Sequence, residues 1–111
     1  MSIPEVEKIW MNGRLVPWDE ARTHVLTHAL HYGSGVFEGI RAYETERGAA
    51  VFRLTEHLER LRRSAKLYYM ELPYTVAELA KATKDVIRAN GLEACYIRPI
   101  VYRGYGEMGL Y

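Results

Sequence analysis

Cysteine is almost absent from this sequence: Cys95 is the one cysteine in 111 residues, which excludes a disulfide framework within the chain. A lone thiol is typical of proteins in a reducing compartment. No apolar run approaches the roughly 20 residues that a membrane span needs. The first residues also lack the basic and then apolar pattern of a secretory signal. Together these absences predict a cytoplasmic protein.

Neither sign of charge is in excess, because 15 basic residues stand against 14 acidic ones. Such a balance gives no overall field to attract nucleic acid or a membrane surface, so we expect neither as a partner. Hydrophobic residues make up 49% of the chain and charged residues 26%, which excludes a disordered chain. The length predicts one small domain with a single core.

Phenylalanine is also scarce, with two residues against nine tyrosines, and eleven of the fifteen basic residues are arginine. Arginine offers a planar fork of donors suited to carboxylate and phosphate. Tyrosine adds a hydroxyl that needs a hydrogen-bond partner. This composition indicates either recognition of a small anion or an ordinary preference for these residues at the surface.

The order of local patterns predicts an α+β fold. Asn12-Gly13 lies between two apolar segments and predicts a hairpin over residues 8–18. We expect a connection with a helical turn over 19–34, then strands over 36–43, 49–53 and 95–103. Pro99 favours an edge, a bulge or an irregular end in the last strand. With two helices between the strands, this order predicts a two-layer sandwich: a mainly antiparallel sheet with two helices on one face.

The two predicted helices carry clear periodic patterns. Thr55 is the expected N-cap of the first helix. Its core stripe is Leu54, Leu58, Leu61, Ala65 and Tyr68. Thr75 and Glu78 form a capping-box pattern at the start of the second helix, which should end at Asn90-Gly91. Its expected inner face is Val76, Leu79, Ala80, Thr83 and Val86/Ile87.

Alternation along the strands places arginines beside aromatic rings. One predicted face holds Phe37, Gly39, Arg41 and Tyr43, and Tyr96, Arg98, Ile100 and Tyr102. Two arginines on one sheet face indicate a bound anion or an acidic group between them, although an outward, solvated face is the simpler alternative. On the first helix, Arg60 falls on a second stripe with His57, Ser64 and Leu67, where it either holds a phosphate or is solvated.

Three histidines, His24, His28 and His31, have a spacing that could place them on one side of a helix. Glycines follow at once, and no carboxylate or thiol falls in register, so we predict no metal site. Gly33-Ser34-Gly35 precedes a strand rather than a helix, which disfavours a dinucleotide-binding loop. Cys95 falls on the inward side of its strand, where we expect an inert thiol rather than a nucleophile.

Several segments together resemble a known family. Residues 28–41 (HALHYGSGVFEGIR) closely resemble the signature of the branched-chain amino-acid aminotransferases, fold-type IV enzymes that use pyridoxal 5′-phosphate. Residues 51–53 with 56–61, 94–99 and 106–109 are similar to further blocks of the same family. The Phe-Glu-Gly-Ile-Arg string at 37–41 resembles the branched-chain members rather than the D-amino-acid aminotransferases or aminodeoxychorismate lyases of this fold.

The resemblance covers only the small N-terminal domain of that two-domain family. It implies that residues 1–111 are a segment, with the C-terminal cofactor-binding domain and its Schiff-base lysine beyond Tyr111. Lys8, Lys66, Lys81 and Lys84 match none of the family's blocks, so we expect no catalytic residue in this segment and no activity from it alone. The implied activity of the parent protein is transamination of leucine, isoleucine or valine with 2-oxoglutarate, which gives a 2-oxo acid and glutamate.

The resemblance also implies roles for individual residues. Arg60 would contact the cofactor phosphate. The residues implied to bind substrate are Phe37, Gly39 and Arg41, with Tyr96 near the α-carboxylate and Arg98 at the distal carboxylate of glutamate. Tyr32 and Leu110 would reach the neighbouring subunit's site, which implies a homodimer or a higher homo-oligomer. Two alternatives stay open: a non-catalytic assembly or binding module, and another fold-type IV member such as a D-amino-acid aminotransferase.

Overall fold

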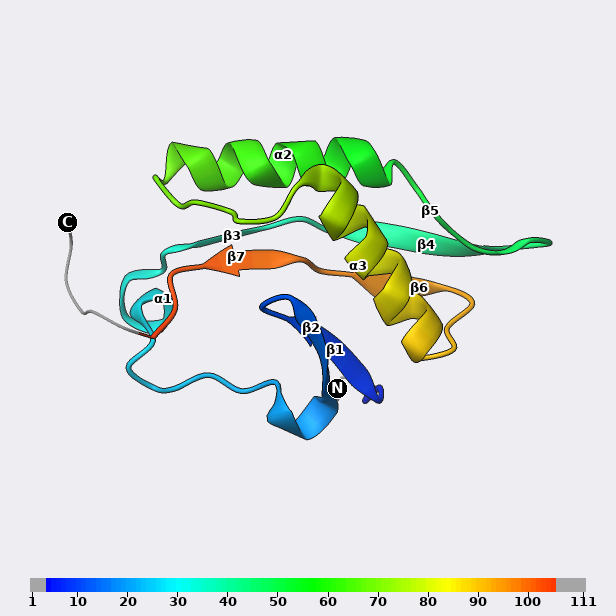
Figure 1. Ribbon diagram of the computed structural model, residues 1–111, viewed down its shortest axis with the longest axis horizontal. Helices are drawn as coiled ribbons and strands as arrows, with labels where there is room; N and C mark the ends of the chain where they lie inside the picture. The colour runs from blue at the N-terminus through cyan, green and yellow to red at the C-terminus, as the bar shows by residue number, and fades with distance from the viewer. Residues whose placement is uncertain (1–3, 106–111) are drawn as a thin grey trace.

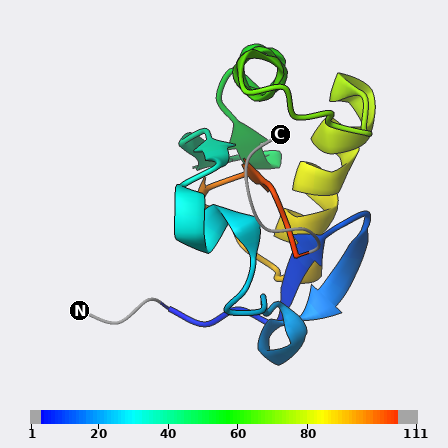
Figure 2. The same ribbon diagram turned by 90° about the vertical axis from the view of Figure 1, so that its left-hand side faces the viewer.

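The computed structural model describes residues 4–105, which form two layers. Helices α2 (Leu54–Leu67) and α3 (Val76–Ala89) cover one face of the antiparallel strands, and Figure 2 shows α2 nearly along its own axis (Figures 1 and 2). The predicted α+β two-layer class is therefore confirmed. Within residues 4–105 no helix is both long and apolar enough to cross a membrane.

The N-terminal hairpin forms as the sequence predicts. Strands β1 (Lys8–Met11) and β2 (Arg14–Pro17) pair in antiparallel fashion around Asn12-Gly13. Both turn residues have positive φ, 51° and 97°, which a two-residue hairpin of this kind requires. A short 3-10 helix, η1 (Trp18–Glu20), begins where the predicted hairpin was to end, and α1 (His28–Tyr32) is the helical turn expected in the connection.

The middle of the fold is one long antiparallel ribbon with an interruption. Strand β3 (Gly35–Phe37) pairs with β7 (Ile100–Tyr102), while β4 (Ile40–Thr45) pairs with β5 (Gly48–Val51) and β6 (Cys95–Ile97). Phe37 faces Ile100 and Ile40 faces Ile97, so the register is the same on both sides of the break.

The prediction of unbroken strands over 36–43 and 95–103 is therefore wrong. Each strand stops near its middle, at residues 38–39 and 98–99. Pro99 has no backbone N–H, so it cannot donate to the ladder at this point. The N–H of Glu38 still donates to the carbonyl of Pro99 at 3.2 Å, and this bond keeps the two halves in register.

Helix α2 confirms most of the expected stripe and corrects its two ends. Leu54, Leu58, Leu61 and Ala65 are buried. The N-cap is Arg53 with φ 50°, and the prediction of Thr55 is wrong because buried Leu54 already starts the helix. Tyr68 is also not part of the core: it follows the last helical turn, and 61% of its surface is exposed. The core lies between α2, α3 and the ribbon, and its buried members are Ile40, Leu54, Leu58, Leu61 and Leu79.

Helix α3 begins with the predicted capping box, in which Thr75 and Glu78 each accept a hydrogen bond from the other's backbone N–H. Leu79, Ala82 and Ile87 are its buried residues, so the predicted inner face misses Ala82. Residues 76, 80, 83 and 86 of that face are only partly buried. The helix ends at Ala89, and Gly91 has φ 60°, as the Asn90-Gly91 pair predicts.

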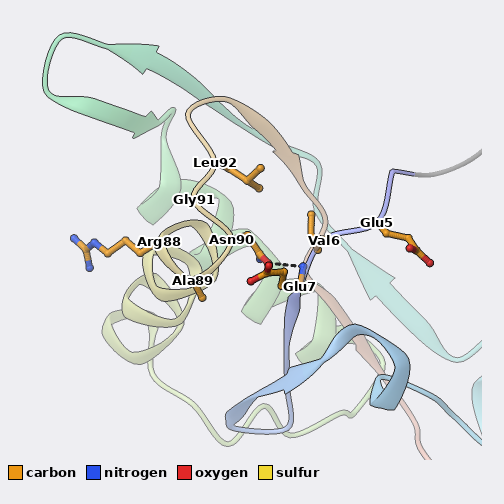
Figure 3. Close-up of a pocket in the computed structure, with 8 residues that line it drawn as sticks. All are labelled: Glu5, Val6, Glu7, Arg88, Ala89, Asn90, Gly91 and Leu92. Atoms are coloured by element: carbon orange, nitrogen blue, oxygen red, sulfur yellow. Dashed lines mark hydrogen bonds between the residues drawn. The ribbon is translucent and has the colours of Figure 1, made fainter.

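Asn90 ties the end of α3 to the beginning of β1. Its Oδ1 accepts from the backbone N–H groups of Glu7 (2.9 Å) and Lys8 (2.8 Å), and its Nδ2 donates to the carbonyls of Lys8 and Val86, both at 2.9 Å. Figure 3 shows Asn90 beside Glu7 in the pocket that these two segments line. The four bonds use the full capacity of the amide.

Candidate functional site

The open face of the ribbon carries the residues predicted to bind a ligand. Arg41 of β4 lies directly opposite Tyr96 of β6, and both are exposed. The residues that flank Arg41, Ile40 and Ala42, are 1% and 2% exposed on the opposite, helix-covered face. Phe37 lies on the open face with 55% of its surface exposed. The predicted alternation of faces is thus confirmed.

Arg98 lies against two aromatic rings on this face. Its guanidinium carbon is 4.5 Å from the Phe37 ring centroid and 5.6 Å from that of Tyr96. Its Nη2 donates to the Tyr96 hydroxyl at 3.3 Å. The guanidinium carbon of Arg41 is 5.8 Å from the centroid of the same Tyr96 ring. Cation–π contacts of this kind hold a guanidinium in place without neutralising it.

Within residues 4–105, neither of these arginines forms an ion pair with an acidic side chain. Of the two explanations that the sequence offered, an intervening acidic group is excluded for residues 4–105, since no ion pair there involves Arg41 or Arg98. Two uncompensated cations on an aromatic face attract anions and are well suited to carboxylates. The other explanation, an outward and solvated face, agrees with the exposure of both arginine side chains.

Gly39 has no side chain, and this allows the Tyr96 hydroxyl to lie close to the backbone of the ribbon. A Cβ on residue 39 would come within 2.6 Å of the Tyr96 Oη and 3.3 Å of its ring. Real Cβ atoms do not approach so closely, so any larger residue would displace the tyrosine. The absence of a side chain at Gly39 therefore leaves the space that the hydroxyl occupies.

Arg60 proves to be paired rather than simply solvated, and its partner is a residue that the sequence analysis missed. Glu38, 5% exposed, accepts from Arg60 Nε and Nη2, both at 2.8 Å, and lies 2.7 Å from His57 Nδ1. The hydrogen bond from Arg60 is the main reason that the pKa of Glu38 is lowered; burial opposes this and His57 adds to it. A charged residue on the inward, apolar side of the strand was the signal that could have found this cluster.

Tyr32, His28 and His31 lie on α1 rather than on the ribbon. Tyr32, at the end of α1, is about half exposed and packs its ring 4.5 Å from that of His28. Leu110 is outside the described residues. His28 Nδ1 is 2.7 Å from Ser34 Oγ, and His31 Nε2 donates to the carbonyl of Val25. Across residues 4–105 no three potential metal ligands come together. Burial raises the pKa of the Cys95 thiol, which leaves it a poor nucleophile.

Comparisons with known proteins agree on one family. The model of the class IV aminotransferases matches residues 35–110. The branched-chain-amino-acid aminotransferase of Pseudomonas aeruginosa is 54% identical over 102 residues, which cover 92% of this chain and 33% of that protein. The enzyme of the same name from Escherichia coli K12 is 46% identical over 110 residues, with 99% of this chain and 36% of that protein covered. The chain thus spans about a third of the length of the curated relatives it matches.

Solved structures give the same result. The branched-chain amino acid aminotransferase of Escherichia coli superimposes with a TM-score of 0.92 at 48% identity, over 95% of this chain and 34% of that one. The T.th. enzyme of the same name, complexed with N-(5′-phosphopyridoxyl)-L-glutamate, gives a TM-score of 0.91 at 54% identity, over 95% and 35%. With a family model that matches most of its length and a fold shared at this identity, the chain belongs to the class IV aminotransferases.

Proposed function

We propose that this chain is the N-terminal small domain of a pyridoxal 5′-phosphate-dependent branched-chain amino-acid transaminase. The observation that carries the proposal is the open face, where Arg41 and Arg98 lie on aromatic rings and, among the described residues, form no ion pair. Relatives at about half identity bear this enzyme's name. The Schiff-base lysine and most of the cofactor contacts would come from the C-terminal domain, so residues 1–111 should be inert alone.

Arg60 has the right free donors for the cofactor phosphate. Its side chain is 62% exposed, and Glu38 occupies only the Nε–H and one N–H of Nη2. Across residues 4–105, Nη1 has no hydrogen-bond partner. A guanidinium has five N–H donors, so three remain for phosphate oxygens. The residue therefore fits the role that the family resemblance gave it.

The open face would distinguish the two substrate classes by charge. We assign the Tyr96 hydroxyl to the α-carboxylate side and Arg98 to the second carboxylate of glutamate or 2-oxoglutarate. Leucine carries no second carboxylate, and its side chain would pack against the rings of Phe37 and Tyr96. In support, the similar T.th. enzyme forms complexes with a phosphopyridoxyl-glutamate and with 4-methylvaleric acid, a branched aliphatic acid.

Bound pyridoxal phosphate would act as the electron sink that makes amino-group transfer possible. The residues of this chain would hold and orient the cofactor and the substrate. Arg60 would bind the phosphate, and Tyr96 and Arg98 would bind the substrate carboxylates. The residues along the rest of the substrate would be Phe37, Gly39 and Arg41. Tyr32 and Leu110 would contribute to the partner subunit's site in a homodimer or higher homo-oligomer. We place the enzyme in the cytoplasm, with small amino acids and 2-oxo acids as its ligands.

Half-reaction titrations of the full-length protein test this proposal. The cofactor absorbance should convert fully with L-leucine, L-isoleucine, L-valine and L-glutamate, and 2-oxoglutarate should reverse the change. D-alanine should leave the spectrum unaltered. Conversion by D-alanine alone would indicate a D-amino-acid aminotransferase instead. A full-length protein that binds no cofactor would favour a non-catalytic module.

A further inference from the structure

We propose that Glu38 is a positioning residue for the cofactor phosphate, acting through Arg60. This inference rests on the proposed function and extends it to a residue without direct contact with the ligand. Glu38 lies at the break between β3 and β4, and its side chain is on the helix-covered face of the ribbon. There it faces α2, which carries both His57 and Arg60.

The backbone and side-chain hydrogen bonds of Glu38 restrain the position of its carboxylate. Its backbone N–H donates to the carbonyl of Pro99, which holds residue 38 in register although both strands are interrupted. Its neighbour Ile40 belongs to the buried core against α2. A buried carboxylate is tolerated only when it is well hydrogen-bonded. Here three donors from two side chains meet that need.

The same three bonds dictate how the guanidinium is oriented. His57 and Arg60 are three residues apart on α2, so they project from one side of the helix toward Glu38. Glu38 takes the side of the guanidinium formed by Nε and Nη2. The remaining edge, with both N–H groups of Nη1 and one of Nη2, is a second fork suited to two phosphate oxygens.

Without Glu38, Arg60 would be a long side chain that is largely exposed and free to rotate. Ordering such a side chain on binding opposes association, by an amount equivalent to about two- to tenfold in affinity. Glu38 reduces this ordering cost, because its hydrogen bonds already orient the guanidinium before a phosphate binds. Hydrogen bonding to Glu38 and the negative charge of that carboxylate also raise the pKa of Arg60 above its usual range.

The test compares two ligands that differ only in the phosphate, pyridoxal 5′-phosphate and pyridoxal, each titrated into the full-length apoenzyme. Glu38→Gln retains the size of the side chain but presents an amide N–H₂ to a donor of Arg60. We expect its dissociation constant for pyridoxal phosphate to rise about two- to tenfold. The constant for pyridoxal should stay within twofold of wild type. In an Arg60→Ala background, Glu38→Gln should cause no further loss.

Glu56→Gln is the matched control, since Glu56 also pairs with an arginine near the start of α2, at the surface. It should change neither dissociation constant. If Glu38→Gln does not fold, Glu38→Asp takes its place, because it keeps the charge and withdraws the acceptor pair. Equal losses for both ligands, or a loss that persists without Arg60, would overturn the inference. Failure of the wild-type protein to bind pyridoxal phosphate would instead overturn the proposed function.

Discussion

The two faces of strands β3 and β4 differ sharply in burial and in the partners of their charged side chains. On the covered face, Ile40 and Ala42 are almost fully buried, and the buried carboxylate of Glu38 accepts three hydrogen bonds from side chains of α2. On the open face, Phe37 and Tyr43 are about half exposed. The two arginines there, Arg41 and Arg98, contact aromatic rings, and neither forms an ion pair with any acidic residue in the described part of the chain.

This difference shows how a single strand can serve stability and recognition at once. Successive residues point to opposite faces, so a side chain proposed to contact the ligand is one residue from a side chain that belongs to the core. Substitutions on the two faces should therefore have separable effects. The covered face should respond in unfolding experiments, and the open face in binding experiments.

The largest effect should come from Leu58→Ala on the covered face. Leu58 is 1% exposed within the core cluster, and its truncation leaves a cavity that the surrounding side chains fill only in part. We expect a loss of about 2–5 kcal/mol in the free energy of unfolding. Urea unfolding of the full-length protein measures it. A loss below about 1 kcal/mol would show that this face is not the centre of the core.

On the open face, Arg98→Ala should impair binding and leave stability intact. A hydrogen bond to a charged group contributes about 1.5–3 kcal/mol, which is roughly ten- to over a hundredfold in affinity. The dissociation constants for glutamate and 2-oxoglutarate should rise by that factor, and that for leucine much less. Half-reaction titrations decide the matter, with the melting temperature as control. Equal losses for glutamate and leucine would mean that Arg98 holds the shared α-carboxylate.

Acid should weaken the covered face through Glu38. Its pKa in the folded state is below the ordinary value of 4.5, mainly because of the bond from Arg60. Its contribution to stability is therefore complete above that ordinary value and is lost as the pH falls through the lower, folded value. The free energy of unfolding should fall over this range, and less steeply in Glu38→Gln. Identical pH profiles for the two proteins would rule out this contribution.

The smallest effect should come from Tyr43→Thr, which keeps a strand-forming residue on the open face. Tyr43 is 54% exposed, so the free energy of unfolding should change by no more than about 0.5 kcal/mol. Ala42→Thr is its matched partner, because it introduces the same residue one position away on the covered face. Overpacking there should be destabilising by about 1–3 kcal/mol. Similar values for the two variants would contradict the separation of faces.

Local rules predicted the parts of the fold that depend on neighbours in sequence. Alternation sorted Phe37 and Arg41 from Ile40, and the Asn12-Gly13 turn and the Thr75 capping box formed as expected. These signals act over two to four residues, and tertiary contacts do not override them here. The N-cap at Arg53 was missed because the burial of Leu54, a tertiary effect, decides where α2 begins.

The Glu38 cluster could not be predicted in the same way. His57 and Arg60 are 19 and 22 residues from Glu38 in sequence, and only the packing of α2 on the ribbon brings them together. The interruption at Pro99 was half predicted, since proline indicated an irregularity but not that the register would continue beyond it. The roles of Arg60, Tyr96 and Arg98 toward ligands remain predictions from the family resemblance.

The bonds of Asn90 to the start of β1 have a consequence for the order of events during folding. They join residues 82 and 83 positions apart, so they close most of the chain into a single loop. The β1–β2 hairpin can form by itself within microseconds, but its bonds to Asn90 cannot form until α3 has been synthesised. At about 5–20 residues per second, the ribosome needs roughly 4–15 seconds to make the residues from the end of the hairpin to Asn90. The hairpin is therefore synthesised several seconds before the residue that ties it to the end of α3.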